Sequence, residues 1–191
     1  MEKPQSASHA KLVALLKQRS VELGSFTLAS GRQSSYYIDA RRTTMSASGQ
    51  RLIGDLGLSR MRQKDWDAQV VGGMTLGADP VAYAIARASS TMPPEIDAFT
   101  VRKEPKGHGK GQQIEGCFRP GSRVVVVEDV VTTGGSALKA IEAVTAAGGK
   151  IVGVLAVVDR EEGGRAAVEQ AGYDMLTLVS LSQLGITTAG G

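Results

Sequence analysis

The stretch Val124–Ser136, which reads VVVVEDVVTTGGS, constrains the fold of this 191-residue chain more than any other segment. It begins with four consecutive valines and shows no alternation of apolar and polar residues there. Such a run is typical of a strand in a parallel sheet that is covered on both faces. Parallel strands need crossover connections, which are usually helices. The sequence therefore predicts an α/β fold around a parallel sheet.

Two acids and a polar loop follow the valine run. Glu128 and Asp129 are expected at the carboxyl edge of the strand, where open α/β sheets bind ligands. Adjacent carboxylates at that edge can accept hydrogen bonds from the vicinal hydroxyls of a ribose. Hydroxyl groups and closely approaching backbone N–H groups come from Thr132, Thr133, Gly134, Gly135 and Ser136. A helix expected over 137–147 starts at this loop, and its positive end favours a phosphate group.

This arrangement predicts a sugar-phosphate site. The alternative is an acidic turn followed by a helix N-cap, because Asp, Thr and Ser are ordinary residues in turns and caps. Two other phosphate motifs are missing: no G-x-G-x-x-G follows an expected strand, and no G-x-x-x-x-G-K-[ST] occurs in the chain. The sequence thus supports neither a dinucleotide site nor a P-loop NTPase.

Composition narrows the class of ligand and the compartment. The net charge of +3 is small and the basic residues are scattered except around Arg102–Lys110, which argues against a general nucleic-acid surface. The single cysteine, Cys117, excludes an intrachain disulfide, and two histidines do not make a zinc cluster. The apolar run Leu12–Leu16 is too short for a membrane span or a signal peptide. We expect one cytoplasmic domain over 1–191, with a small anionic ligand and no nucleic-acid or membrane partner.

The expected elements alternate along most of the chain. Helices are expected near 8–23, 48–62, 78–88, 137–147 and 165–171, and strands near 69–72, 98–102, 123–127, 151–158 and 175–179. Gly24 is the expected stop of the first helix, and a hairpin of 26–28 with 36–38 follows it. The pattern predicts a parallel sheet with helices between its strands.

The segment Arg102–Gly121 breaks this alternation because it is rich in glycine and nearly free of apolar residues. Its length predicts a flexible lid over about 103–120. Three cations and one imidazole lie at its start, namely Arg102, Lys103, Lys106 and His108. Such a set suits a multiply charged leaving group such as pyrophosphate, whose charge grows as its bond breaks. A solvated basic loop is the alternative.

The VVVVEDVVTTGGS stretch resembles the signature of the type I phosphoribosyltransferases, and the pattern R-K-E-x-K-x-H-G from Arg102 resembles the catalytic loop of the orotate phosphoribosyltransferase family. This resemblance implies a five-stranded parallel core flanked by helices, a small N-terminal hood over about 1–40 and a flexible catalytic loop. It also implies transfer of ribose 5-phosphate from phosphoribosyl pyrophosphate (PRPP) to orotate, with release of pyrophosphate. Mg²⁺ would arrive on PRPP, without a dedicated protein metal site.

The resemblance also implies roles for particular residues. The PRPP-binding residues would be Arg102, Lys103, Lys106, His108, Glu128, Asp129, Val130, Val131, Thr132, Thr133, Gly134, Gly135 and Ser136. The residues that carry catalysis would be Lys103, Lys106, His108, Glu128 and Asp129. Orotate would bind to Thr132, Arg160, Tyr36 and Tyr37.

A further motif, GGMTLGADP, looks like the family's pyrophosphate loop. Its residues Thr75, Leu76 and Gly77 would allow close backbone approach and an unusual peptide conformation. Ala29 and Leu76 stand where some members of the family carry lysine.

Some of these roles have a simpler alternative. The rings of Tyr36 and Tyr37 are equally suited to packing within the hairpin. Arg160 could instead form a surface ion pair with Glu161 or Glu162.

The resemblance further implies a homodimer in which the lid reaches the partner's site. Two other functions remain open at this point. A purine phosphoribosyltransferase would share Glu128–Ser136 but would not need Arg160. A PRPP-sensing nucleic-acid-binding regulator would need an added basic surface, which the sequence does not contain.

Overall fold

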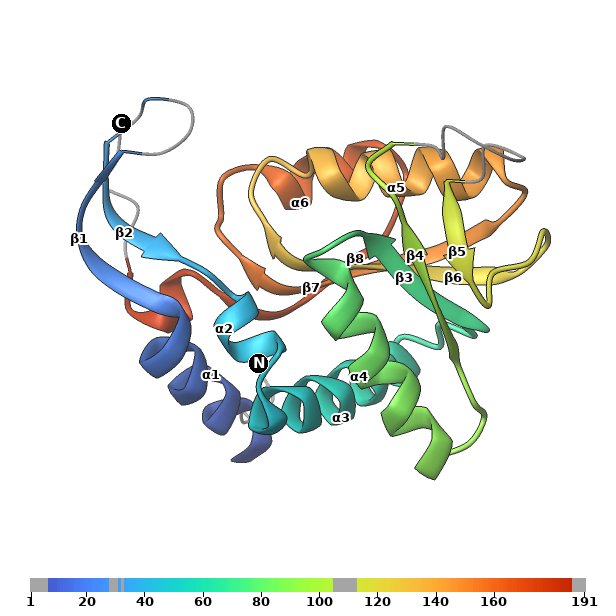
Figure 1. The fold of residues 1–191 in the computed structure, drawn as a ribbon, viewed down its shortest axis with the longest axis horizontal. Coiled ribbons are helices and arrows are strands. Elements are labelled where there is room, and N and C mark those ends of the chain that lie inside the picture. Colours follow the sequence, from blue (N-terminus) through green and yellow to red (C-terminus); the bar gives the residue numbers. More distant parts are fainter. Residues whose placement is uncertain (1–6, 28–30, 32, 105–112, 187–191) are drawn as a thin grey trace.

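The computed structural model describes residues 7–27, 31, 33–104 and 113–186. Its main sheet has six strands in the order β5-β4-β3-β6-β7-β8. These strands are β3 (Val70–Met74), β4 (Asp97–Val101), β5 (Ile114–Gly116), β6 (Arg123–Val131), β7 (Lys150–Asp159) and β8 (Met175–Ser180). All neighbours pair in parallel except β5, which pairs antiparallel with β4 at one edge (Figure 1). The predicted parallel core of five strands is confirmed, and β5 adds a sixth strand that we did not predict.

Helices cover both faces of this sheet (Figure 1). One face carries α1 (Ala7–Ser20), α3 (Ala47–Gln63) and α4 (Ala78–Thr91), and the other carries α5 (Gly135–Ala146) and α6 (Gly164–Gln170). Val125 and Val127 belong to the core on the α3 and α4 side, whereas Val124 and Val126 belong to the core beneath α5. All four are fully buried. The valine run lacks alternation because β6 contributes to two cores, one on each face.

The N-terminal hairpin stands apart from the main sheet (Figure 1). It consists of β1 (Val21–Thr27) and β2 (Gln33–Ile38), and the short α2 (Arg41–Thr44) leads from it to α3. The helix predicted over 8–23 ends at Ser20, because Val21 already pairs with Ile38 across the hairpin. Gly24 therefore lies within a strand and does not end the helix. Strand pairing overrode the local helical pattern here.

Strand β6 is longer than the predicted 123–127. It continues to Val131, because its pairing with β7 extends to Val131 opposite Asp159. Glu128 and Asp129 therefore lie within the last part of the strand and not beyond its end. They stay at the carboxyl end of the sheet, but they take the alternation of a strand, so their side chains leave on opposite faces.

The segment predicted as a lid is described only in part. Lys106 and His108 belong to residues 105–112, which lie outside the described residues. On the described side, β5 pairs with β4, and the backbone N–H of Arg102 donates to the carbonyl of Gln113 at 2.8 Å. The two ends of the loop therefore start from neighbouring positions at the edge of the sheet.

The described chain ends after the 3-10 helix η1 (Ser182–Leu184). Glu161 fixes its start, because the backbone N–H and the hydroxyl of Ser182 donate to the Glu161 carboxylate at 3.0 and 2.9 Å. Within the described ranges, no helix is long and apolar enough to cross a membrane.

Candidate active site

The carboxyl end of β6 directs its two acids toward two different loops. Glu128 is 5% exposed and borders a pocket of about 210 Å³ together with the loop Thr132–Ser136. Asp129 lies against Gly77 in the connection between β3 and α4, since a Cβ added at Gly77 would come within 2.3 Å of Asp129 Oδ1. The alternation of the strand thus gives each loop one carboxylate.

The loop predicted to hold a phosphate forms the start of α5. Gly134 has a φ of 84°, and a Cβ there would lie 3.0 Å from the carbonyl oxygen of Gly164, so the position favours glycine on both counts. The first residues of α5 line the pocket, and N–H groups at a helix start lack intrahelical partners and suit an anion. Lys139 also lines this pocket and adds a cation. We missed Lys139 in the sequence, although it lies three residues beyond Ser136 on the predicted helix.

Both carboxyl groups are perturbed by their surroundings. Burial raises the pKa of Glu128 from its ordinary value of 4.5 to about 8, and the charge of Asp129 adds to the shift. Burial also raises the pKa of Asp129, although backbone hydrogen bonds and the charge of Arg41 oppose it. Glu128 Oε1 is buried and has no hydrogen-bond partner among the described residues. Near neutral pH, Glu128 is largely protonated and can both donate and accept a hydrogen bond.

The loop Thr75–Gly77 connects β3 to α4. The peptide bond between Thr75 and Leu76 is cis, which agrees with the unusual conformation expected for this loop. The buried carboxylate of Asp79 accepts hydrogen bonds from the hydroxyls of Thr75 at 2.7 Å and Thr100 at 2.8 Å, and so ties the loop to β4. Leu76 is 54% exposed. We missed Asp79 in the sequence, although its place in the first turn of a helix directly after the loop could have indicated it.

Arg160 follows β7 at the same edge of the sheet, and its backbone N–H donates to the carbonyl of Val131 at 3.0 Å. Its Nη2 lies 2.8 Å from Glu162 Oε1 and 3.3 Å from the hydroxyl of Tyr36. The side chains of Arg160 and Glu162 are only 13% and 17% exposed. The alternative that we considered for Arg160, an ion pair with Glu161 or Glu162, is thus present with Glu162, but it is largely buried and not a surface pair.

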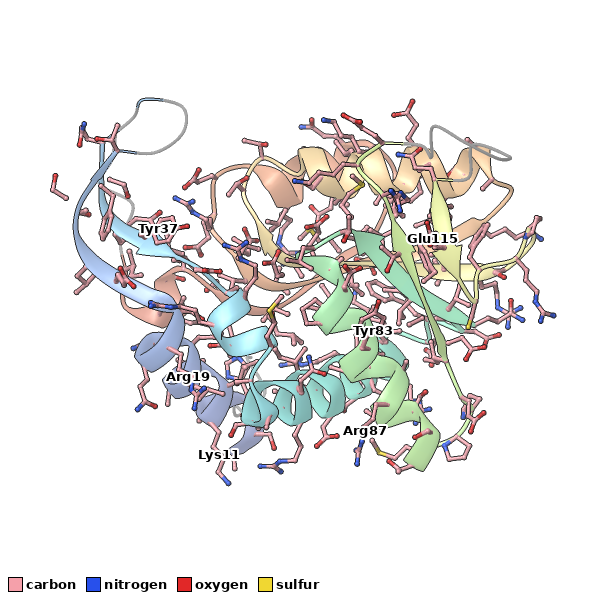
Figure 2. All side chains as sticks on the ribbon, viewed as in Figure 1. Lys11, Arg19, Tyr37, Tyr83, Arg87 and Glu115 are labelled. Atoms are coloured by element: carbon pink, nitrogen blue, oxygen red, sulfur yellow. The ribbon has the colours of Figure 1, made fainter. Side chains whose placement is uncertain are left out.

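The two tyrosines of the hairpin have different surroundings. Tyr36 is 6% exposed, and its ring centre lies 5.2 Å from the guanidinium carbon of Arg160. Tyr37 is 42% exposed, and its ring packs 5.8 Å from the ring of Phe26 on the hairpin (Figure 2). Packing within the hairpin therefore accounts for the ring of Tyr37, whereas the ring of Tyr36 reaches Arg160.

The described start of the segment predicted as a lid borders a second pocket, of about 710 Å³, along α4, β4 and β5. Arg102, Lys103 and Thr75 line it, so the start of this segment and the loop after β3 share one cavity. Tyr83 on α4 and Glu115 on β5 line it from two different elements (Figure 2). Arg102 Nη1 also lies 3.1 Å from Glu115 Oε1. The structure thus brings Lys103 to the loop after β3, while the other predicted lid cations fall outside the described residues.

One more cation acts on the site. Arg41 Nε donates to Asp39 Oδ1 at 2.8 Å, and this pair holds the pKa of Asp39 below its usual range. The Arg41 charge also opposes the rise that burial causes in the pKa of Asp129. No motif marks Arg41 in the sequence, and its only signal is its position just after the second arm of the hairpin.

Among the described residues, no group of three or more His, Cys, Asp or Glu side chains is placed to hold a metal ion.

Comparison with known proteins places this geometry in a family. Residues 70–177 match the phosphoribosyl transferase domain. The chain is 45% identical over 181 residues to orotate phosphoribosyltransferase of Rhodopirellula baltica, covering 93% of this chain and 94% of the relative. It is 49% identical over 177 residues to the enzyme of that name in Aquifex aeolicus, covering 91% and 96%. The crystal structure of Mycobacterium tuberculosis H37Rv orotate phosphoribosyltransferase in complex with PRPP superposes with a TM-score of 0.79 at 45% identity, covering 94% of this chain and 99% of that one.

The sheet, the loop at the start of α5 and the matched domain define a phosphoribosyltransferase of type I architecture. The relatives that cover nearly the whole chain narrow this class. The chain belongs to the orotate phosphoribosyltransferase family.

Proposed function

We propose that this protein transfers ribose 5-phosphate from PRPP to orotate, which gives orotidine 5′-monophosphate and pyrophosphate, a step of de novo pyrimidine (UMP) biosynthesis. The observation that carries the proposal is the convergence of the loop Thr132–Ser136, Glu128, Asp129 and Arg160 at one edge of the sheet. Relatives named for this enzyme, at 45% and 49% identity, support it.

The loop Thr132–Ser136 holds the 5-phosphate of PRPP in this proposal. Its support is the glycine conformation at Gly134, the helix start that follows, and the cation of Lys139 in the same pocket. Backbone N–H groups would bind the phosphate oxygens, and Lys139 would compensate part of the charge.

Glu128 and Asp129 hold the ribose hydroxyls. Glu128 has a buried acceptor atom without a partner among the described residues, and as a protonated acid it also offers one O–H donor. The bond between the anomeric carbon and the pyrophosphate oxygen breaks while positive charge develops on the ribose. Negative carboxylate charge near that carbon would stabilise this transition state, so the ionised form of Glu128, with its proton released to solvent, would be the more active one.

Pyrophosphate, in this proposal, leaves toward the backbone of the loop Thr75–Gly77 and the lid cations. Arg102 and Lys103 would contact it from the described lid base, and Lys106 and His108 from the rest of the lid. The cavity shared by Thr75 and Lys103 supports the assignment. The protein would thus stabilise the growing charge of the leaving group chiefly by placing cations and N–H donors around it.

Mg²⁺ fits this site as a companion of PRPP. It prefers oxygen ligands and usually keeps water and substrate phosphates in its shell, and Asp129 offers a carboxylate beside the loop Thr75–Gly77. When bound, the ion would neutralise charge on the leaving pyrophosphate.

Orotate lies between Thr132, the hairpin at Tyr36 and Tyr37, and Arg160. The guanidinium of Arg160 would pair with the orotate carboxylate. A ring nitrogen of orotate, already largely deprotonated, would attack the anomeric carbon. The protein needs to hold the two reactants in line and to exclude water from the developing cation, rather than to supply a strong base.

The same proposal includes a homodimer in which the predicted lid contributes Lys103 to the partner's site. Its predicted range of about 103–120 is too long at its end, because β5 within that range pairs with β4 in the main sheet. The support for the dimer is the family and the position of Lys103 beside β5, the outer strand of the described sheet. The single-domain organisation, the hood over about 1–40 and a cytoplasmic location stay predictions from the sequence.

Loss of orotate absorbance on adding protein, PRPP and Mg²⁺ tests the function directly. Orotate should be consumed, whereas uracil, adenine and hypoxanthine should not react appreciably. Arg160→Ala should lower kcat/KM for orotate about tenfold or more, because a charge-assisted contact contributes roughly 1.5 to 3 kcal/mol. Arg19→Ala, on the exposed end of α1, is the matched control and should leave kcat/KM unchanged (Figure 2). Equal reaction of uracil would contradict an acidic pyrimidine substrate, and reaction of a purine base would favour the purine enzyme.

A further inference from the structure

Arg160 is held by two side chains that belong to different parts of the fold. Glu162 lies just after β7, like Arg160 itself, and Tyr36 comes from the second strand of the hairpin. The same guanidinium nitrogen, Nη2, contacts both: Glu162 Oε1 at 2.8 Å and the Tyr36 hydroxyl at 3.3 Å. The guanidinium carbon also lies 5.2 Å from the centre of the Tyr36 ring, which is a cation–π distance.

These contacts fix the plane of the guanidinium without using all of its donors. An Arg side chain has five N–H donors in a rigid fork, and the contacts found here involve Nη2. Arg160 Nε is buried and has no hydrogen-bond partner among the described residues. The guanidinium of Arg160 can therefore donate hydrogen bonds to a further acceptor. A carboxylate is the acceptor whose geometry best matches the N–H groups of a guanidinium.

We propose that Glu162 is a positioning residue that holds the Arg160 guanidinium against Tyr36 in the orientation that receives the orotate carboxylate. The inference rests on the proposed function and adds to it a residue, Glu162, that neither the sequence motifs nor the comparisons assign. Arg160 has a long side chain with many rotamers, and a partner that fixes it removes much of the entropy loss on binding substrate. Glu162 acts through Arg160 and does not itself touch the substrate.

Glu162 also sets the charge of this corner of the site. With Arg160 and Glu162 both ionised, the largely buried pair is neutral before substrate binds. A ligand must then offer a good acceptor geometry and not merely a negative charge. The pair therefore favours a planar carboxylate placed in reach of the fixed fork over other anions.

A purely structural role is the competing explanation, since the cluster also joins the hairpin to the main sheet. The two roles differ in what they do to the kinetic constants. Loss of positioning raises KM for orotate, because the Arg160 guanidinium is no longer held in its binding orientation before orotate binds. General loosening of the hairpin lowers the melting temperature and disturbs PRPP and orotate together.

The experiment compares Glu162→Ala with Glu162→Gln in the full-length protein. Glu162→Ala should raise KM for orotate about tenfold, with KM for PRPP changed less than about twofold. Glu162→Gln keeps an acceptor oxygen of the same reach and should recover most of the loss. Glu169→Gln, which alters an exposed i,i+4 pair with Arg165, is the matched control and should match wild type.

Three outcomes would overturn the positioning role: an unchanged KM for orotate in Glu162→Ala, an equal rise of both KM values, or a Glu162→Gln variant as impaired as Glu162→Ala. A wild-type protein that does not consume orotate would instead overturn the proposed function. The two failures are therefore distinguishable within one set of assays.

Discussion

Replacing Glu128 by Gln should stabilise the protein while it impairs the site. The structure buries this carboxyl group at 5% exposure, beside Asp129, and raises its pKa from 4.5 to about 8. Such a group keeps its proton in the folded state at pH values where the unfolded chain has already lost it. Its contribution to stability is fully present below pH 4.5 and is lost as the pH rises through about 8.

The size of this effect follows from the difference between the two pKa values. One pH unit corresponds to about 1.4 kcal/mol, so a shift of about 3.5 units (from 4.5 to about 8) corresponds to a loss of roughly 5 kcal/mol across the whole window. Between pH 5.5 and 7.5, the loss is roughly 3 kcal/mol. Gln cannot ionise, so the stability of the variant does not fall in this way as the pH rises. For a chain of this size, the melting temperature of Glu128→Gln minus that of wild type should increase by roughly 5 to 10 °C between pH 5.5 and pH 7.5.

The assay is thermal unfolding of both proteins from pH 5 to 8.5, without PRPP, because a bound ligand would stabilise the folded state by mass action. Glu169→Gln, at an exposed position, is the control and should follow wild type at every pH. The same variant should lose about 10²-fold in kcat/KM if Glu128 stabilises the developing positive charge on the ribose. A difference in melting temperature between Glu128→Gln and wild type that does not change with pH would refute the reasoning, because the raised pKa requires a slope.

Two further predictions concern the dimer and the loop after β3. Lys103→Ala and Asp129→Asn chains should each be nearly inactive, and their mixture should regain roughly a quarter of wild-type activity, because half the dimers are mixed and each has one intact site. No recovery after verified subunit exchange would mean that Lys103 serves its own chain. Gly77→Ala should raise KM for PRPP or lower kcat by on the order of 10²-fold, since its Cβ would come within 2.3 Å of Asp129 Oδ1. Activity near that of wild type, with unchanged melting, would show that the loop can move aside.

The parts of the fold predicted well are those that depend on local pattern. The valine run of β6 predicted a strand buried on both faces, and Val124–Val127 are all buried between two layers of helices. The helix after the loop Thr132–Ser136 also followed from local pattern, since glycine and hydroxyl residues commonly precede a helix. The errors lie where strand pairing outside the local sequence window decided the outcome. Val21 was predicted in the first helix but pairs with Ile38 in the hairpin. Strand β5 pairs with β4 within a segment predicted as a loop.

The sequence by itself determined which chemical groups stand at the carboxyl end of the sheet, because the strand, the two acids and the loop Thr132–Ser136 are contiguous in the chain. Only the tertiary structure decided the pKa values of these groups and the residues that they contact. The raised pKa of Glu128 requires the burial that packed layers create, and the contact of Asp129 with Gly77 joins residues 52 positions apart. The Tyr36, Arg160 and Glu162 cluster likewise joins two elements that no local pattern connects. Local propensity acts over a few residues, whereas desolvation and ion pairing depend on what the folded chain brings together.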